Sequence, residues 1–141
     1  PSFSKPNPDP KRASLAVTSK ASSELTGPTF RFRDASQDWK LNFRRYDDIK
    51  GQNLIQETTG GGVALFDFDL DGRLDVFLTQ GSRLPRSAKS TDFTNELFRN
   101  VGGLENVTAP AGVTSHGFHT GCAVGDFNDD GFPDIYVTAY G

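Results

Sequence analysis

The stretch that decides the fold is Asp67-Phe-Asp-Leu-Asp-Gly-Arg-Leu-Asp75, and a second copy stands at Asp126-Phe-Asn-Asp-Asp-Gly-Phe-Pro-Asp134. Each copy places an oxygen-bearing side chain at loop positions 1, 3, 5 and 9, and a glycine at position 6. Carboxylates held this close repel one another, and a bound cation relieves the repulsion. Because Ca²⁺ accepts about six to eight oxygen ligands in irregular geometry, it suits these short carboxylates better than Mg²⁺ does. The sequence therefore predicts two calcium-binding loops.

The ligands predicted in each loop follow from these positions. Position 7 is Arg73 in one copy and Phe132 in the other, and each would have to offer its backbone carbonyl. The predicted metal ligands are Asp67, Asp69, Asp71, Arg73, Asp75, Asp126, Asn128, Asp130, Phe132 and Asp134. The alternative is a pair of acidic surface turns that use Asp, Asn and Gly only for turn geometry.

The residues around the two loops argue against an EF-hand. Position 12 is Leu78 in the first copy and Val137 in the second, where an EF-hand needs a bidentate Glu between two helices. The flanks are short runs of β-branched and aromatic residues that are typical of strands. These runs are Val63–Phe66, Val76–Thr79, Ala123–Val124 and Ile135–Thr138. Each loop is therefore predicted to join two strands of a hairpin.

The similarity between the two copies extends beyond the loops, with a period of 59 residues. The further matching pairs are Gly62 with Gly121, Ala64 with Ala123, Thr79 with Thr138, and Gly81 with Gly141. A fixed period of this size with strands in each unit indicates stacked units such as propeller blades, whose sheets are covered by their neighbours. We therefore expect an all-β fold, a partial β-propeller of about two blades of antiparallel strands with calcium-binding hairpin loops.

A family resemblance follows from the same residues. The run from Glu57 to Gly72 resembles the FG-GAP/VCBS repeat of integrin-α-type β-propellers, and more narrowly the group with ASPIC/UnbV domains that includes cartilage acidic protein. The runs Asn95–Asn100 and Leu104–Val113 resemble the outer strands of that group. The resemblance covers the chain from about Phe30 to its end. It implies a propeller with calcium in several hairpin loops, located outside the cytoplasm, and it implies no single activity.

Composition divides the chain into two parts. Residues 1–27, rich in Pro, Ser, Lys and Thr, are predicted to be a disordered leader or linker, and residues 28–141 to be the repeats. Within the repeats we expect blade one at about 55–113 and an incomplete blade two from about 114. The remaining blades of a longer parent chain are then expected partners. The alternation from Phe30 to Phe43 predicts half-buried strands.

Charge and hydropathy restrict the compartment and the partners. The net charge is −3, and eight of the eighteen acidic residues lie in the two loops. No apolar run resembles a signal peptide or a membrane span, so the expected extracellular or periplasmic location rests on the resemblance. The single cysteine, Cys122, excludes an internal disulfide and is predicted to be a buried apolar residue.

Basic and aromatic residues alternate in the stretch around residues 31–45, as they do on nucleic-acid platforms. Acidic residues dilute that charge, so a solvated strand face is expected and nucleic acid is not an expected partner. The basic residues are Arg31, Arg33, Lys40, Arg44 and Arg45, and the acidic ones are Asp34, Asp38, Asp47 and Asp48.

Two functions remain open at this point. The first is a non-catalytic, calcium-binding recognition or adhesion module with a protein or glycan ligand, because each loop lacks an adjacent His, Ser or Lys. The alternative is part of a polysaccharide-active or metal-dependent hydrolytic enzyme, in which Asp129 is the spare acid of the second loop. His116 and His119 are expected to pack at a blade entrance and not to form a metal site. The 82–92 loop is either a partner site or an insertion without a function.

Overall fold

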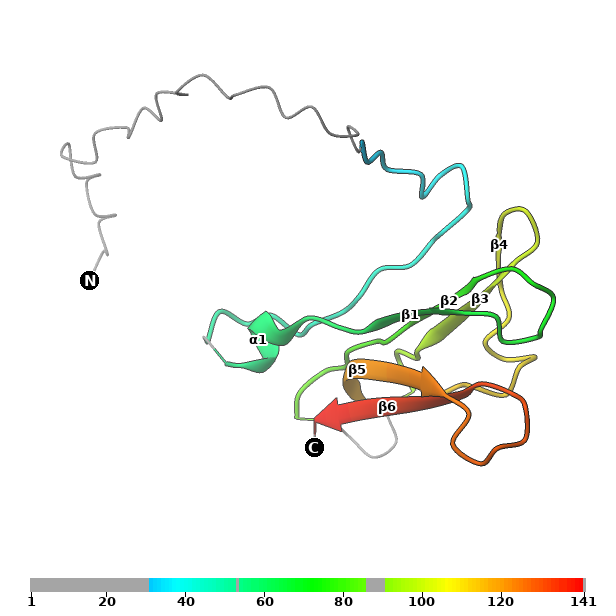
Figure 1. Ribbon diagram of the computed structural model, residues 1–141. Coiled ribbons are helices and arrows are strands. Elements are labelled where there is room, and N and C mark those ends of the chain that lie inside the picture. Colours follow the sequence, from blue (N-terminus) through cyan, green and yellow to red (C-terminus); the bar gives the residue numbers. More distant parts are fainter. Residues whose placement is uncertain (1–30, 53, 86–90, 141) are drawn as a thin grey trace, which may run out of the picture. The chain divides into compact units, whose positions relative to one another are not determined.

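The computed structural model describes residues 31–52, 54–85 and 91–140. Every helix and strand that the structure describes belongs to one compact unit, Arg33–Gly141. The elements are α1 (Gln56–Thr59), β1 (Val63–Phe66), β2 (Asp75–Leu78), β3 (Glu96–Asn100), β4 (Leu104–Asn106), β5 (Phe118–Gly125) and β6 (Asp134–Tyr140) (Figure 1). The leader or linker predicted at residues 1–27 lies outside the described residues.

The strands form two antiparallel sheets. Strands β1 to β4 pair in chain order to make one sheet, and β5 pairs with β6 to make the other. Phe66 stands opposite Asp75 where β1 meets β2, and Gly125 stands opposite Asp134 at the same place in the second hairpin. This arrangement confirms the predicted fold class, an all-β fragment of the propeller type.

One strand prediction is wrong. Residues 31–50 contain no strand, although the pattern from Phe30 to Phe43 predicted half-buried strands, and Phe30 itself lies outside the described residues. The backbone instead turns at residues 36–40, where the amide of Leu41 donates to the carbonyl of Ser36 at 2.8 Å. The Asp34 carboxylate accepts from the amide of Ser36, so side chains that favour turns override the alternation.

Residues 44–48 form a strap that crosses the ends of both sheets. Arg45 donates from Nη1 to the carbonyl of Thr79 at 2.9 Å, and from Nη2 to the carbonyl of His119 at 2.8 Å. Its guanidinium also lies over the Phe118 ring, 5.5 Å from the ring centre. The sequence suggested a solvated strand face for Arg45, whereas the structure uses its planar fork to join the two hairpins.

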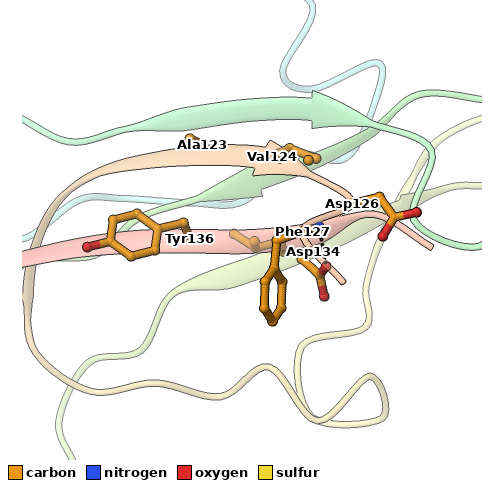
Figure 2. A pocket seen from close by; sticks show the side chains of 8 residues that line it. Ala123, Val124, Asp126, Phe127, Asp134 and Tyr136 are labelled. Carbon is orange, nitrogen blue, oxygen red and sulfur yellow. Dashed lines mark hydrogen bonds between the residues drawn. The ribbon is translucent and has the colours of Figure 1, made fainter. Parts of the chain in front are cut away.

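An apolar core lies between the two sheets. Phe66, Phe77 and Leu97 of the first sheet are buried, and the side chains of Ile135 and Val137 from β6 pack against them. The opposite face of β5–β6 carries a groove of about 640 Å³ next to the second acidic loop (Figure 2). The core is therefore shared by both hairpins, as stacked units require.

The backbones of the two hairpins lie close together at Gly62. A Cβ atom there would lie 2.7 Å from the amide nitrogen of Cys122 and 2.8 Å from Cα of Gly121. Strands β1 and β5 lie side by side at this point (Figure 1). Glycine has no Cβ atom, so at this position it permits the close approach of the two backbones.

Candidate metal centre

The first acidic loop turns tightly around the Asp67 carboxylate. Oδ1 of Asp67 accepts from the amide of Asp71 at 3.0 Å, and Oδ2 accepts from the amide of Gly72 at 2.7 Å. Leu70 and Gly72 adopt left-handed conformations, with φ of 58° and 84°. These two reversals bring the side chains at positions 1, 3 and 5 to one side of the loop.

The second acidic loop has the same conformation and the same pair of amide-to-carboxylate hydrogen bonds. Asp126 accepts from the amides of Asp130 and Gly131 at 3.1 and 2.8 Å. Asp129 and Gly131 have φ of 59° and 86°. Position 6 is glycine in both loops, which a positive φ favours, whereas Leu70 at position 4 of the first loop gives no sign in the sequence of its left-handed conformation.

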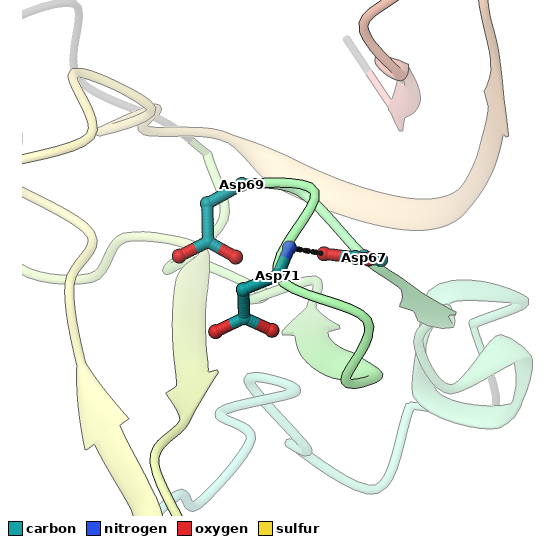
Figure 3. A group of neighbouring side chains, drawn as sticks. All are labelled: Asp67, Asp69 and Asp71. Atoms are coloured by element: carbon teal, nitrogen blue, oxygen red, sulfur yellow. Dashed lines mark hydrogen bonds between the residues drawn. The ribbon is translucent and has the colours of Figure 1, made fainter.

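Three carboxylates converge in the first loop. Asp67, Asp69 and Asp71 each offer an oxygen, and these oxygens all lie within 4.8 Å of one another (Figure 3). Oδ1 of Asp69 is buried and accepts no hydrogen bond from the described residues. A buried carboxylate oxygen without a donor is costly unless a cation satisfies it. The residues therefore fit a metal ion, and this group could hold one.

Two arginines lie against the converged carboxylates. Nη2 of Arg99, from β3, lies 2.5 Å from Asp69 and 3.4 Å from Asp71, and Nη2 of Arg73 lies 2.5 Å from Asp71. The Asp69 and Asp71 side chains are only 21% and 18% exposed. Arg99 stands 24 or more residues from the loop in sequence, so only the pairing of β2 with β3 reveals this contact.

The position-9 carboxylates are engaged with the backbone. Asp75 is fully buried, and its two oxygens accept from the amides of Phe68 at 3.0 Å and Asn100 at 2.8 Å. Asp134 accepts from the amide of Phe127 at 2.9 Å. Asp75 is not part of the converged group, so its role as a late ligand stays a prediction. In this structure both position-9 carboxylates close the base of the hairpin.

The remaining predicted ligands differ between the loops. The amides of Arg73 and Phe132 donate to the position-5 carboxylates at 3.0 and 2.9 Å, and ligation by their carbonyl groups stays a prediction. Asn128 donates from Nδ2 to Asp130 at 2.9 Å. The second loop is exposed, and no ion pair reaches it within the described part of the chain. The two loops thus share a backbone but differ in charge environment.

The histidine pair contributes to packing near the start of β5. Nδ1 of His116 lies 2.7 Å from the carbonyl oxygen of Phe93. His119 is 5% exposed, and its amide donates to the carbonyl of Gln80 at 3.0 Å. Among the described residues neither histidine belongs to a group of three metal-binding side chains. This favours the packing interpretation.

Two further predictions from the sequence, on Cys122 and on the 82–92 loop, are tested only in part. Cys122 is half-buried against the shared core, and burial raises the pKa of its thiol. In the 82–92 loop, residues 86–90 lie outside the described residues, and Nε of Arg83 lies 3.4 Å from Asp92 across it. In the described part of the chain, no helix has both the length and the apolar character needed to cross a membrane.

Comparison with protein families gives one match. The model described as FG-GAP-like repeat matches residues 67–137, which span half of the chain and contain both acidic loops. Neither the curated proteins nor the solved structures include a match. The duplicated hairpin, the shared core between two antiparallel sheets and the family match agree with one another. The chain belongs to the FG-GAP-like repeat family.

Proposed function

We propose that this β-propeller-type repeat region binds calcium in its two hairpin loops and acts outside the cytoplasm as a non-catalytic recognition or adhesion module. The observation that carries the proposal is the convergence of Asp67, Asp69 and Asp71, with one buried Asp69 oxygen lacking a donor. The second loop supports it because its backbone repeats the same hydrogen bonds.

The donor set favours calcium among the biological cations. In both loops the side-chain atoms that would ligate a metal ion are oxygens, which hard cations prefer. In the first loop Asp67, Asp69 and Asp71 would hold the ion, and in the second Asp126, Asn128 and Asp130 would. When bound, calcium supplies a positive charge that cancels the repulsion among the carboxylates. It therefore stabilises the hairpin that carries them.

The hydrogen bonds of the loops support a non-catalytic role. Both oxygens of Asp67 and both of Asp75 accept from backbone amides, so these carboxylates are committed to holding the loop. A general acid or base has to exchange a proton with substrate, which such bonds oppose. The enzyme alternative then depends on Asp129, which is exposed at position 4 of the second loop.

Location and partner class follow from the family and the expected affinity. FG-GAP repeats are typical of extracellular proteins. Extracellular calcium modules bind at roughly 10⁻⁴–10⁻³ M, a range that matches calcium outside cells. We propose a protein or glycan ligand, and screening the calcium-loaded protein against glycan and surface-protein arrays would test that part.

The first prediction concerns calcium and thermal stability. Adding millimolar calcium to a fully chelated sample should raise the melting temperature, because an ion that binds only the folded form stabilises it. A concentration about ten times the Kd would add about 1.4 kcal/mol per site. For a unit of this size that is roughly 5 °C or more. Circular dichroism melts with EDTA, Ca²⁺ or Mg²⁺ measure the effect.

Matched variants separate ligation from net charge. Asp69→Asn should lose much of the calcium-induced shift, whereas Asp129→Asn removes the same charge from a position outside the ligand set and should keep it. An unchanged melting temperature in the presence of calcium would remove the proposal. Glycan turnover that disappears in Asp129→Asn and persists in Asp69→Asn would favour the hydrolase instead.

A further inference from the structure

A pocket of about 530 Å³ opens at the end of the first sheet that faces away from the acidic loops. Strand β2 runs from Asp75, in the first acidic loop, to Leu78, and the segment that follows β2 forms one wall of the pocket. The strap and the residues that lead into α1 form the other walls. We call it the strap pocket and define it by six of its lining residues, Asp48, Lys50, Leu54, Gln56, Glu57 and Pro85. Its volume falls in the range of small-molecule sites, about 300–1,000 Å³.

Gln56, the first residue of α1, brings an unsatisfied acceptor to this pocket. The residue is 9% exposed, and its Oε1 accepts no hydrogen bond from the described residues. A buried acceptor without a donor is costly, so this oxygen calls for a donor from outside the chain. The strap pocket therefore presents a buried acceptor to a ligand that carries a hydrogen-bond donor.

The charged groups of the strap pocket already have partners within the chain. Oδ2 of Asp48 accepts from the ammonium group of Lys50 and from the amide of Leu84, at 2.8 Å each. Oε1 of Glu57 accepts from the amides of Lys50 and Gln52, at 2.9 and 3.2 Å. A charged ligand would have to displace these contacts. A neutral ligand would not, because a carboxylate has about four acceptor sites and can take further hydrogen bonds.

The same contacts hold the acceptors of the pocket in place. The Asp48 side chain is 8% exposed, and the Lys50 ammonium group also donates to the carbonyl of Leu84. These bonds join the strap to the segment after β2, so the two walls of the pocket are tied together. Acceptors that are fixed before binding lose little conformational freedom when a ligand arrives, which favours affinity.

The strap pocket also has an apolar side. Leu54 is 42% exposed, and Pro85 is exposed as well. Ligand sites commonly combine apolar surface with a few polar groups that fix orientation. A pyranose ring matches such a combination, because its hydroxyl groups donate and accept hydrogen bonds while its C–H groups pack on apolar side chains.

We propose that the strap pocket binds a neutral sugar residue of a glycan, with Oε1 of Gln56 accepting from one sugar hydroxyl and the carboxylates of Asp48 and Glu57 accepting from others. The inference rests on the recognition role proposed above and narrows its ligand to a glycan. A protein partner usually engages carboxylates through Arg or Lys side chains, and these would compete with Lys50 for Asp48.

Saturation-transfer NMR tests the proposal directly. The probes are the methyl glycosides of glucose, galactose, mannose and N-acetylglucosamine, each at millimolar concentration with calcium present, and at least one should bind. Gln56→Leu should weaken that binding about tenfold or more in an NMR titration, because it removes the acceptor and nearly keeps the side-chain volume. The lost oxygen has no donor among the described residues, so the melting temperature should not fall.

A matched control makes the same chemical change elsewhere. Gln37→Leu replaces an exposed glutamine of the turn at residues 36–40 and should bind the glycoside like the parent chain. Gln56→Leu should also keep the calcium-induced rise in melting temperature, because none of the residues that line the strap pocket belongs to an acidic loop. The pocket and the calcium sites can therefore fail independently of one another.

Four outcomes would overturn the proposal. Binding of no glycoside would leave Oε1 of Gln56 to an ordered water molecule. Equal binding by Gln56→Leu and the parent chain would place the sugar elsewhere. A clear fall in the melting temperature of Gln56→Leu would give Gln56 a structural role. Binding on a surface-protein array that disappears in Gln56→Leu, without any glycoside binding, would assign the pocket to a protein.

Discussion

Arg99 brings a positive charge to the converged carboxylates of the first loop. Its guanidinium lies against Asp69 and Asp71, two of the three converged carboxylates. A fixed positive charge so near a binding site for a divalent cation opposes occupancy, and the opposition is strongest where the groups are half-buried. The second loop has no such arginine within the described residues, and Phe132 stands where the first loop has Arg73.

This contact gives a prediction at the scale of the residue. Arg99→Gln should increase the calcium affinity of the first loop several-fold, since it removes the opposing charge and leaves Asp69 without its ion-pair partner. Isothermal titration calorimetry at low ionic strength measures the change, and added salt should reduce it. Arg33→Gln, which removes an exposed arginine that pairs with Asp38, is the control and should leave the affinity unchanged. Weaker binding by Arg99→Gln would contradict the argument.

Individual residues also decide how the strap attaches. Asp48 has a side chain that is 8% exposed and adopts a φ of 49°. A hydrogen bond from the Lys50 ammonium group, the largest effect, holds the pKa of this carboxyl below its usual value. The amide of Leu84 donates to the same carboxylate at 2.8 Å. Asp48 therefore ties the strap to the segment that follows β2.

At the scale of the element, the hairpin is the unit that the sequence encodes. The ends of β1 and β2 are set by the loop, because Asp75 begins β2 and closes the turn through the amide of Phe68. The same bond recurs between Asp134 and Phe127 in the second hairpin. Hydroxyl contacts recur as well, since Thr79 donates to the carbonyl of Gly62 at 3.2 Å and Thr138 donates to that of Gly121 at 3.3 Å.

The approach of the two hairpins gives the prediction at this scale. Gly62→Ala should destabilise the protein by about 1–3 kcal/mol, because the added methyl group would overlap the backbone of Gly121 and Cys122. Gly103→Ala is the matched control, since its nearest neighbour is a carbonyl oxygen at 4.0 Å and it should be close to neutral. Chemical denaturation of both variants measures the difference. Equal stability of the two would show that the hairpins separate at no cost.

At the scale of the whole molecule, both sheets depend on one core. Phe66, Phe77 and Leu97 are buried by residues of the other hairpin as well as by their own. Arg45 adds a polar link, because it donates to a carbonyl group of each hairpin. Elements that share a core of this kind unfold together.

Because the two hairpins share a core, we expect calcium binding in either loop to stabilise the same unfolding transition of the whole unit. Asp126→Asn, in the exposed second loop, should lower the calcium-induced stabilisation of the entire unit while leaving a single melting transition. Trp39 lies next to the first sheet, because its carbonyl accepts from the amide of Leu104 in β4 at 2.7 Å. Melts followed by far-ultraviolet circular dichroism and by the fluorescence of Trp39 should therefore coincide. Two separate transitions would show instead that the hairpins fold independently.

Prediction from sequence succeeded where the information is local. The spacing of Asp67, Asp69, Asp71 and Gly72 describes a turn whose geometry depends on adjacent residues, and the structure confirms a hairpin loop there. It failed from Phe30 to Phe43, since an alternating pattern becomes a strand only when another strand pairs with it. The narrower resemblance to the ASPIC/UnbV group, the calcium ligands and the partner stay predictions.

The sequence by itself determined the two acidic hairpins, their 59-residue spacing and the all-β class, because turn chemistry and strand alternation act over a few neighbouring residues. Only the tertiary structure decided that Arg99 faces the carboxylates, that Arg45 joins the hairpins and that Asp75 closes a turn. It also decided which apolar faces are paired. These features depend on contacts between segments far apart in the chain, and no local pattern specifies such contacts.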